Sequence, residues 1–570
     1  MSGGGGVARK VRRTVARSAK AGLGWTTSPT LLRSRVVSGL WGVALASPGL
    51  PEGTRSRLAG HVQDSLLRAG RTEQALRTSD AALRRIRNRR FRADLLMRQV
   101  GAELEHGTPP RLPAAVSAEL AVADGLLAKG DRRGAVLAVQ TVHRQLFHRR
   151  LQFDRMTSPL ADDPAGFLAQ WHASATVQAL SAPRGRSGAP GPVPTDRPLR
   201  LLIATYGNHG FLSAIRRHFE QRPDVEVRFL DPGEDGTHVP LLNNSRAMME
   251  HILAGRSSFG DRVEEWLGPQ LEWADVVFVD WCAAMAVLFS LVDPGSTRVV
   301  VRLHSFEAFA HWPHLVDFSR VDDLVFVSDH LRDLAVAAVP AMASAGTRLH
   351  VISNAMDLRS YRRPKNPDAR FTLGVVGIKA VAKDPGWAVR VLRHLRAHDD
   401  RYRLALYGHD LDADASPDAR RFWDELLAEI ADLEAAGAVV RMGQTEDMPE
   451  AFRDVGVVVS SSVRESFHCA LVEGAASGAV PVVRDWPFFA GRSASARSLF
   501  PPDWVVDSPE EAAERIRSLT ATEQAWRSAG EAAAEHAIAT WDWEIVKNHF
   551  DDLVYGMAVA TAGGSPGGGK

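Results

Sequence analysis

Short apolar runs recur from residue 199 onward, and most are followed by a polar or glycine-containing loop and then by a helical pattern. Continuous β-branched runs of this kind are typical of parallel strands that are buried on both faces. Their alternation with helices predicts α/β domains. The predicted strands are 199–204, 225–230, 276–279, 299–303, 324–327, 350–352, 371–377, 403–407, 439–442, 457–459 and 480–483.

The alternation of strand, loop and helix begins at two places in the chain. Leu199–Ala204 is followed by a glycine-containing turn and a helix from Phe211, and a second strand beginning at Phe371 leads through a polar loop to a helix from Trp387. Two starts predict two Rossmann-like domains. The Pro/Gly-rich stretch before the first start can hold neither a helix nor a central strand, so we interpret it as a linker. The predicted segments are 1–25 (basic), 26–181 (helical), 182–198 (linker), 199–365 and 366–556 (Rossmann-like), and 557–570 (tail).

The region 26–181 is rich in Ala, Leu and Arg and contains a faint repeat, because Leu66–Leu76 resembles Leu126–Val136. In both copies a glycine is followed five positions later by an alanine. This spacing resembles the helix-turn-helix of tetratricopeptide repeats, in which glycine ends one helix and alanine lets the next pack closely. Two copies are fewer than an array needs, so both a plain helical bundle and a repeat-type surface for a protein partner stay open.

Charge and cysteine content exclude several classes of protein. The 570 residues carry a net charge of only +2, which does not indicate a nucleic-acid binder. Two cysteines are too few for a disulfide framework or a structural zinc site and fit a reducing, cytoplasmic setting. No apolar stretch approaches the roughly 20 residues that span a bilayer. However, the first 51 residues contain no Asp or Glu, which predicts peripheral contact with the inner face of the cell membrane.

The most informative segment follows the run Val457–Val459. Three serines at 460–462 begin a loop that contains Glu465, and Glu473 lies eight positions later on the next predicted helix. Ligands of open α/β sheets bind at the carboxyl ends of strands, where a carboxylate can hold paired hydroxyls. With the small residues from Gly478 to Pro481 behind it, the segment resembles the E-x7-E signature of retaining glycosyltransferases of family 4.

This resemblance implies a GT-B fold, in which two Rossmann-like domains face each other across a cleft; here an all-α domain precedes them. It also implies that Glu465 contacts the transferred sugar and that Glu473 holds the nucleotide ribose. Phe467 matches the family's aromatic position, whereas His468 stands where the family usually has glycine. The donor would be a nucleoside-diphosphate sugar, with no further cofactor and no metal.

The loop after the strand at 371 supplies candidate cations for the departing diphosphate. The family pattern is glycine, arginine, and lysine five positions after the arginine. Gly377 and Lys383 match it, but Ile378 stands in place of the arginine. We predict that Lys379 substitutes for it. The helix that follows adds partial positive charge from its N-terminus.

The first Rossmann-like domain supplies further candidates. The family has a histidine at a comparable strand end that faces the donor sugar, which implies this role for His304; Glu307 is a weaker candidate. Gly207 and Gly210 would let the first helix approach the donor phosphates or the acceptor. Asn354 matches an interdomain Asn-Gly-x-Asp segment, with alanine in place of glycine.

Together these residues predict a retaining, metal-independent hexosyltransferase of polysaccharide biosynthesis that transfers a sugar from a nucleoside diphosphate to an envelope glycan or lipid-linked acceptor. The alternative is a non-catalytic GT-B module that acts as a scaffold in an envelope-assembly complex, with the helical domain as its working part. Release of nucleoside diphosphate separates the two.

Overall fold

The computed structural model describes residues 35–104, 107–207, 209–344 and 346–559. It divides into two compact units, Met1–Leu146 with Gln170–Val177, and Phe147–Ala169 with Gln178–Lys570. The predicted basic segment 1–25 lies outside the described residues, as does 560–570 of the predicted tail.

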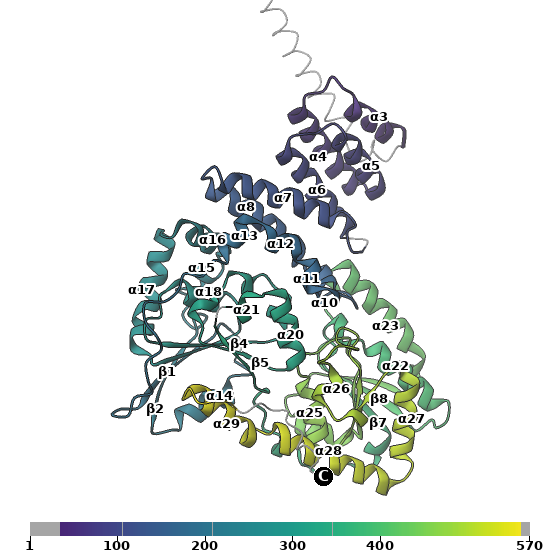
Figure 1. Ribbon diagram of the computed structural model, residues 1–570. Coiled ribbons are helices and arrows are strands. Elements are labelled where there is room, and N and C mark those ends of the chain that lie inside the picture. The colour runs from purple at the N-terminus through teal and green to yellow at the C-terminus, as the bar shows by residue number, and fades with distance from the viewer. Residues whose placement is uncertain (1–34, 105–106, 208, 345, 560–570) are drawn as a thin grey trace, which may run out of the picture. The chain divides into compact units, whose positions relative to one another are not determined.

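The first unit is helical throughout its described residues (Figure 1). The faint repeat corresponds to two helix-turn-helix pairs. Gly70 and Gly130 take left-handed φ values of 69° and 77° in the turns, and Ala75 and Ala135 are fully buried in the helices that follow. Each copy therefore has the local geometry that its glycine and alanine predict. The main helices are α3 (Arg35–Ala46), α4 (Glu52–Arg68), α5 (Thr72–Leu83), α6 (Arg89–Glu103), α7 (Leu112–Leu127) and α8 (Arg132–Leu146).

Several short helices follow before the first strand. They are α9 (Arg149–Gln152), α10 (Pro159–Asp162), α11 (Pro164–Phe167), α12 (Ala169–Ala173) and α13 (Ala175–Leu180).

The second unit contains two six-stranded parallel sheets, as the GT-B prediction requires. The first has the order β2-β1-β3-β4-β5-β6. Its strands are β1 (Leu199–Ala204), β2 (Val225–Leu230), β3 (Val276–Asp280), β4 (Arg298–Leu303), β5 (Asp323–Phe326) and β6 (Arg348–Val351). We call β1–β6 with their connecting helices the first half.

The second sheet has the order β12-β11-β10-β7-β8-β9. Its strands are β7 (Thr372–Val376), β8 (Arg403–Tyr407), β9 (Val439–Gly443), β10 (Val457–Ser460), β11 (Val480–Arg484) and β12 (Val505–Val506). This is the classical Rossmann order, whose direction reverses between β7 and β10. We call it, with its helices, the second half.

Helices flank both sheets (Figure 1). In the first half they include α14 (Ser213–Glu220), α15 (Val239–Leu242), α16 (Ser245–Ala254), α17 (Ser258–Trp273), α18 (Ala284–Leu291), α19 (Ser305–Ala308), α20 (Asp329–Ala338) and α21 (Ala341–Ser344). In the second half they include α22 (Pro385–Arg396), α23 (Pro417–Ala435), α24 (Met448–Ala451), α25 (Cys469–Ala476), α26 (Ala496–Leu499), α27 (Pro509–Thr520) and α28 (Glu523–Trp541). The C-terminal helix α29 (Trp543–Val554) packs into the core of the first half through Val546 and Phe550.

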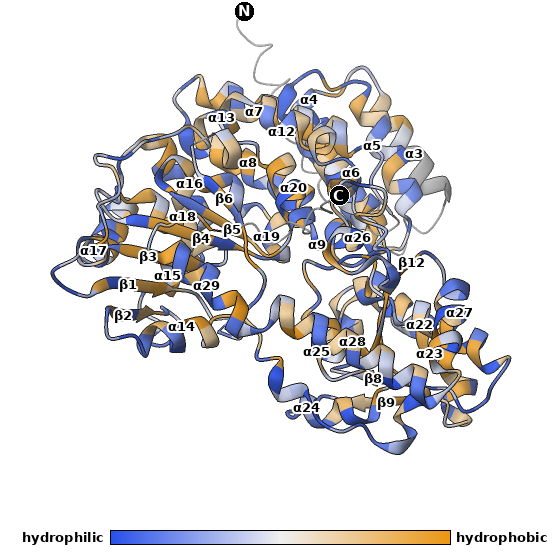
Figure 2. Cartoon of the chain, turned by 60° about the horizontal axis from the view of Figure 1, so that its bottom comes forward, coloured by the Kyte–Doolittle hydropathy of each residue, from blue (hydrophilic) through white to orange (hydrophobic). Residues whose placement is uncertain are grey.

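The strands form because their residues suit burial on both faces. All residues of β3, β4 and β10 are buried, and the inner strands are largely hydrophobic in Figure 2. On one face of the second sheet, Leu373 and Val457 pack in a cluster with Trp387 and Leu392 of α22. The sheets thus form rigid platforms whose carboxyl-end loops carry the polar residues described below.

The chain crosses between the two halves twice, and Asp542 joins the crossings. Its carboxylate accepts hydrogen bonds from Leu358 N (3.1 Å) and Arg359 Nε (3.1 Å), and Trp543 N donates to Met356 O (2.7 Å). Asp542 is buried, so these bonds are shielded from water. They hold the two crossing segments together.

The stretch 182–198 is bound to the first half. Arg186 Nη1 contacts both carboxylate oxygens of Asp322 (2.7 and 2.8 Å), and Arg186 Nη2 donates to Thr297 O (2.8 Å), while Arg184 N donates to Asp317 (2.8 Å). These contacts lie at the amino-terminal edge of the first sheet, because Thr297 and Asp322 directly precede β4 and β5.

No helix in the described part of the chain is long and apolar enough to cross a membrane.

Candidate active site

The carboxyl edge of the second sheet brings together residues from loops that are far apart in the chain. Gly377 follows β7, and the loop Ser461–His468 follows β10, so both lie at the point where the strand order reverses. Two hydrogen bonds to backbone carbonyls join the loops, since Val463 N donates to Ala382 O (2.8 Å) and Ser461 Oγ donates to Lys383 O (2.7 Å). This is the position at which open α/β sheets bind ligands.

At the centre of this edge, Lys383 Nζ lies 2.6 Å from Glu465 Oε1. Ser462 Oγ donates to the same carboxylate oxygen. Burial works to raise the pKa of Glu465, but the Lys383 ammonium and the hydrogen bonds outweigh it and lower this pKa to about 2. Glu465 is therefore ionised at neutral pH, and the cluster pairs a carboxylate with an ammonium in a site largely closed to water.

Gly377 lies beside this pair. Its φ is 86°, and a Cβ atom there would lie 3.9 Å from Lys383 Nζ. Ile378, at the family's arginine position, is buried in the core of the second half, whereas Lys379 is exposed. The structure thus places Lys383, and not Lys379, against Glu465.

His468 begins α25 in a left-handed conformation with φ 67°. Glycine adopts this conformation without strain, which explains why the family usually has glycine here. The ring is buried, its Nδ1 lies 2.7 Å from Ser460 Oγ, and burial lowers its pKa to about 4. His468 is therefore uncharged at neutral pH. Phe467 is fully buried with its ring against Trp541.

Glu473 lies on α25 and contacts the segment that joins the two halves. Burial raises the pKa of its carboxyl, and the Tyr361 hydroxyl, from the interdomain segment, donates a hydrogen bond to it. Asn354 Nδ2 lies 3.3 Å from Cys469 Sγ at the start of the same helix. These two contacts of α25 therefore come from the segment that joins the two halves. Gly474 is required beside Glu473, because a Cβ there would come within 2.6 Å of the Val458 side chain.

The first half has its own buried polar cluster. His304 follows β4, and its Nε2 lies 3.0 Å from Asp280 Oδ1, which also accepts from Arg302 Nε at 2.6 Å. The His304 ring packs on Trp281 at 4.1 Å and on Phe211 at 5.0 Å. Burial lowers the pKa of His304. All these contacts lie within the first half.

Glu307 is fully buried next to this cluster. Its Oε1 accepts from the backbone of Cys282 (3.0 Å) and His304 (3.1 Å), and burial raises its pKa to about 8. The side chain is therefore protonated at neutral pH and joins the ends of β3 and β4. In the loop after β1, Gly207 N donates to Asp231 Oδ2 at 3.2 Å. Gly210 is exposed.

Strained backbone is concentrated in these loops. In the described ranges, three residues other than glycine have positive φ: Trp281 (72°), Asp384 (39°) and His468 (67°). Trp281 follows β3, Asp384 is next to Lys383, and His468 ends the Glu465 loop. Left-handed conformations of bulky residues are costly and are found mainly where function requires them.

Two residues of this region were not predicted from the sequence. His330 Nε2, at the start of α20 in the first half, lies 3.0 Å from Glu465 O. Arg464 is buried between the rings of Phe309 (4.3 Å), Phe153 (4.8 Å) and Phe488 (5.4 Å). His330 has a signal in the sequence, since it closely follows the strand predicted at 324–327. Arg464 has none beyond its position next to Glu465.

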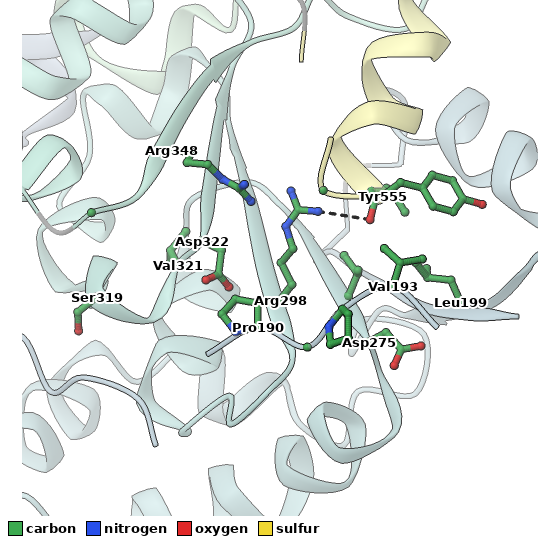
Figure 3. A pocket seen from close by; sticks show the side chains of 16 residues that line it. Pro190, Val193, Leu199, Asp275, Arg298, Ser319, Val321, Asp322, Arg348 and Tyr555 are labelled. Carbon is green, nitrogen blue, oxygen red and sulfur yellow. Dashed lines mark hydrogen bonds between the residues drawn. The ribbon is translucent and has the colours of Figure 1, made fainter. Parts of the chain in front are cut away.

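A different cavity lies at the opposite edge of the first sheet (Figure 3). Its volume is about 480 Å³, and Arg298, Asp322 and Arg348 line it where their strands begin. Arg298 pairs with the buried Asp323 at 2.7 Å and also donates to Val554 O at 3.4 Å. Because this cavity is at the amino ends of the strands and its charges are paired, we assign it a structural role.

The fold and the site define a protein of the GT-B class. Residues 370–522 match the family model described as Glycosyl transferases group 1, which supports a glycosyltransferase. A comparison with curated proteins found no match.

Several solved structures resemble the chain. HepE of Anabaena, solved with UDP and glucose, is 15% identical and covers 62% of this chain and 98% of its own, with a TM-score of 0.44. An E. coli trehalose-6-phosphate protein bound with UDP-2-fluoro glucose is 12% identical, with 63% and 100% coverage and a TM-score of 0.48. S. aureus TarM is 13% identical, with 52% and 59% coverage and a TM-score of 0.41.

Proposed function

We propose that the chain is a retaining, metal-independent glycosyltransferase that uses a nucleoside-diphosphate sugar. The observation that carries this proposal is the contact of Lys383 with Glu465 at the strand-order reversal of the second sheet. An ammonium beside an ionised carboxylate suits a ligand that has both a diphosphate and sugar hydroxyls. The N-terminus of α22, directly after Lys383, adds partial positive charge.

In the proposed reaction the acceptor hydroxyl oxygen bonds to the anomeric carbon on the face that the diphosphate leaves. The bond from the anomeric carbon to the diphosphate oxygen breaks, and its electron pair stays on the diphosphate. The hydroxyl proton passes to a diphosphate oxygen, so no protein base is needed. Lys383 stabilises the charge that develops on the leaving group, and Glu465 orients the sugar.

Glu473 is proposed to hold the ribose. Its partly buried carboxylate already accepts from the Tyr361 hydroxyl, and its raised pKa shows that the charged form lacks full compensation. Paired ribose hydroxyls would supply the missing donors. We further propose that the acceptor is an envelope glycan or lipid-linked sugar and that the protein acts in the cytoplasm at the inner face of the cell membrane.

The experiment that tests this function has two arms. A thermal-shift panel of nucleoside diphosphates identifies the base, because a ligand at a hundred times its dissociation constant stabilises by about 2.7 kcal/mol. Nucleoside-diphosphate release is then measured from sugars on that base. We expect stabilisation and release, and release should be about 100-fold slower in Lys383→Ala. Stabilisation by no nucleotide, together with no release, would overturn the proposal.

A non-catalytic scaffold is the second candidate, and one observation favours it. Ile378 is buried at the position where the resembling family has a cation for the diphosphate. A scaffold would bind a partner through the helical unit and release no nucleoside diphosphate from any donor, which separates it from the enzyme.

A further inference from the structure

The first half contains a cavity at the carboxyl ends of its own strands. It has a volume of about 450 Å³, and its walls include Tyr206 after β1, Asp280 and Trp281 at the end of β3, and Phe306 and Trp312 beyond β4. The sheet order β2-β1-β3 reverses direction between β1 and β3. The cavity therefore has the same place in the first sheet that the Lys383–Glu465 pair has in the second.

Two buried polar atoms of this wall lack a protein partner. Within the described chain, Asp280 Oδ2 accepts no hydrogen bond and Trp281 Nε1 donates none. The Asp280 side chain is completely buried. An unpaired buried polar group is costly and therefore rare, so two such groups in adjacent residues indicate a ligand that pairs with both. A hydroxyl group can donate to the carboxylate and accept from the indole.

The backbone of Trp281 is strained. Its φ of 72° is unfavourable for a bulky side chain, and its ring packs on His304 at 4.1 Å. Asp280 Oδ1 is already occupied by Arg302 and His304, which fixes the carboxylate with Oδ2 as its remaining acceptor. These contacts orient the two groups before any ligand arrives.

The rest of the wall is mostly apolar, with Asn243 as one further polar residue, and carries no positive charge. Tyr206 and Phe306 are 40% and 49% exposed although they are large aromatic residues, and Leu242, Ala284 and Met285 add aliphatic surface. In the part of the chain that the structure describes, neither lysine nor arginine lines the cavity. A phosphate or carboxylate placed here would meet no cation on the wall, because Arg302 is paired with Asp280 Oδ1 and does not line the cavity.

We propose that this cavity holds the acceptor, and that the acceptor is an uncharged alcohol that presents an apolar group to the aromatic wall and its hydroxyl to Asp280 and Trp281. This inference rests on the proposed function and specifies its acceptor class. It places the uncharged end of a glycolipid or aglycone in the cavity and excludes a phosphate-bearing group from it. Asp280 is a positioning residue for the hydroxyl, because the proton leaves with the diphosphate.

Binding of small probes to the full chain, without nucleotide, tests the proposal. Saturation-transfer NMR compares 2-phenylethanol, which has an aromatic ring and one hydroxyl, with phenyl phosphate, which replaces the hydroxyl by an anion, and with glycerol, which lacks the apolar group. We expect 2-phenylethanol to bind and the other two to bind about tenfold more weakly or not at all. Equal or tighter binding of phenyl phosphate or glycerol would overturn the proposal, as would failure of 2-phenylethanol to bind up to its solubility limit.

Three variants locate the binding. Phe306→Ala removes an exposed ring of the wall, and Trp281→Phe removes the indole donor but keeps a ring against His304. Both are expected to weaken 2-phenylethanol about fivefold or more. Met442→Ala truncates a comparably exposed apolar residue (48%) on β9 and should leave binding unchanged. Equal affinity in all three variants would place the probe elsewhere and overturn the assignment. Because nucleotide-induced stabilisation is measured separately, loss of probe binding with retained nucleotide binding contradicts only the acceptor inference.

Discussion

Lys383 Nζ lies 2.6 Å from Glu465 Oε1, although the two residues are 82 positions apart and follow different strands. β7 and β10 are neighbours in the sheet only because the strand order reverses between them. The contact is therefore a consequence of topology, and it joins the predicted cation of the departing diphosphate to the predicted carboxylate of the sugar.

The first prediction concerns the lysine. Lys383→Ala should slow sugar transfer by about 100-fold or more, because it removes the cation that faces the leaving diphosphate. Turnover at saturating donor is the measurement, and Lys379→Ala is the matched control in the same loop. We expect the exposed Lys379 to matter much less. A larger loss in Lys379→Ala would mean that this residue has taken the place of the arginine absent at Ile378.

The second prediction concerns the ribose. Glu473→Ala should weaken nucleoside-diphosphate binding by about 1–3 kcal/mol, since the ribose hydroxyls would lose their acceptor. Isothermal titration calorimetry measures this affinity directly. Glu425→Ala, on the exposed face of α23, is the control and should bind as the unaltered chain does. Unchanged affinity in a folded Glu473→Ala protein would remove this residue from the donor site.

Much of this architecture was predictable from local patterns. The predicted bounds of β1 and β2 agree with the structure, because an apolar run between turn residues specifies a strand by itself. β12 was not predicted, since its two residues, Val505 and Val506, are too few to form a pattern. The predicted GT-B fold is confirmed by the two parallel sheets. The packing of Phe550 was not predictable, because no local sequence pattern indicates that a helix following the second sheet packs into the core of the first half.

The candidate site also contains residues that were predictable from the sequence and residues that were not. Gly377, Lys383 and Glu465 are recognisable from motif spacing, and the structure brings them together. His330 and Arg464 act through contacts across the two halves, and sequence spacing carries no information on such contacts.

The third prediction follows from the position of Arg464. Its guanidinium lies between Phe309 and two further rings, one residue before Glu465. Arg464→Met should keep the fold, because an apolar chain of similar length suits the aromatic surroundings. Turnover should fall about tenfold as the Glu465 loop loosens, while nucleotide affinity stays unchanged. Arg464→Lys keeps the charge without the planar stacking and should be intermediate. Unchanged turnover in Arg464→Met would show that the contacts of Arg464 with the three aromatic rings serve packing alone.

The fourth prediction concerns the N-terminus, which lies outside the described residues. The cluster from Arg9 to Lys20 contains no acidic residue, and each basic residue near an anionic membrane contributes about 1 kcal/mol. The full chain should therefore co-sediment with vesicles that contain phosphatidylserine, and a chain starting at Trp25 should not. The alternative is a solubilising arm, for which both chains would behave alike. Binding that persists in high salt would also argue against electrostatic attachment.

The last prediction uses the buried carboxyl of Glu307. Burial raises its pKa from 4.5 to about 8, so the folded protein retains a proton that the unfolded chain loses. The free energy of unfolding should therefore decrease as pH rises from about 4.5 to 8, by up to 1.4 kcal/mol per pH unit, and this contribution should become constant above pH 8.

Glu307→Gln keeps the oxygen that accepts from the backbone of Cys282 and His304 but cannot ionise. Urea denaturation over this pH range should show the variant gaining stability relative to the unaltered chain as pH increases. Glu265→Gln, which is exposed on α17, should show no such gain. If the free energies of unfolding of Glu307→Gln and the unaltered chain change with pH in parallel, Glu307 is already ionised in the folded protein. The side chain that accepts from the backbone of Cys282 and His304 would then be a carboxylate, and not the protonated acid.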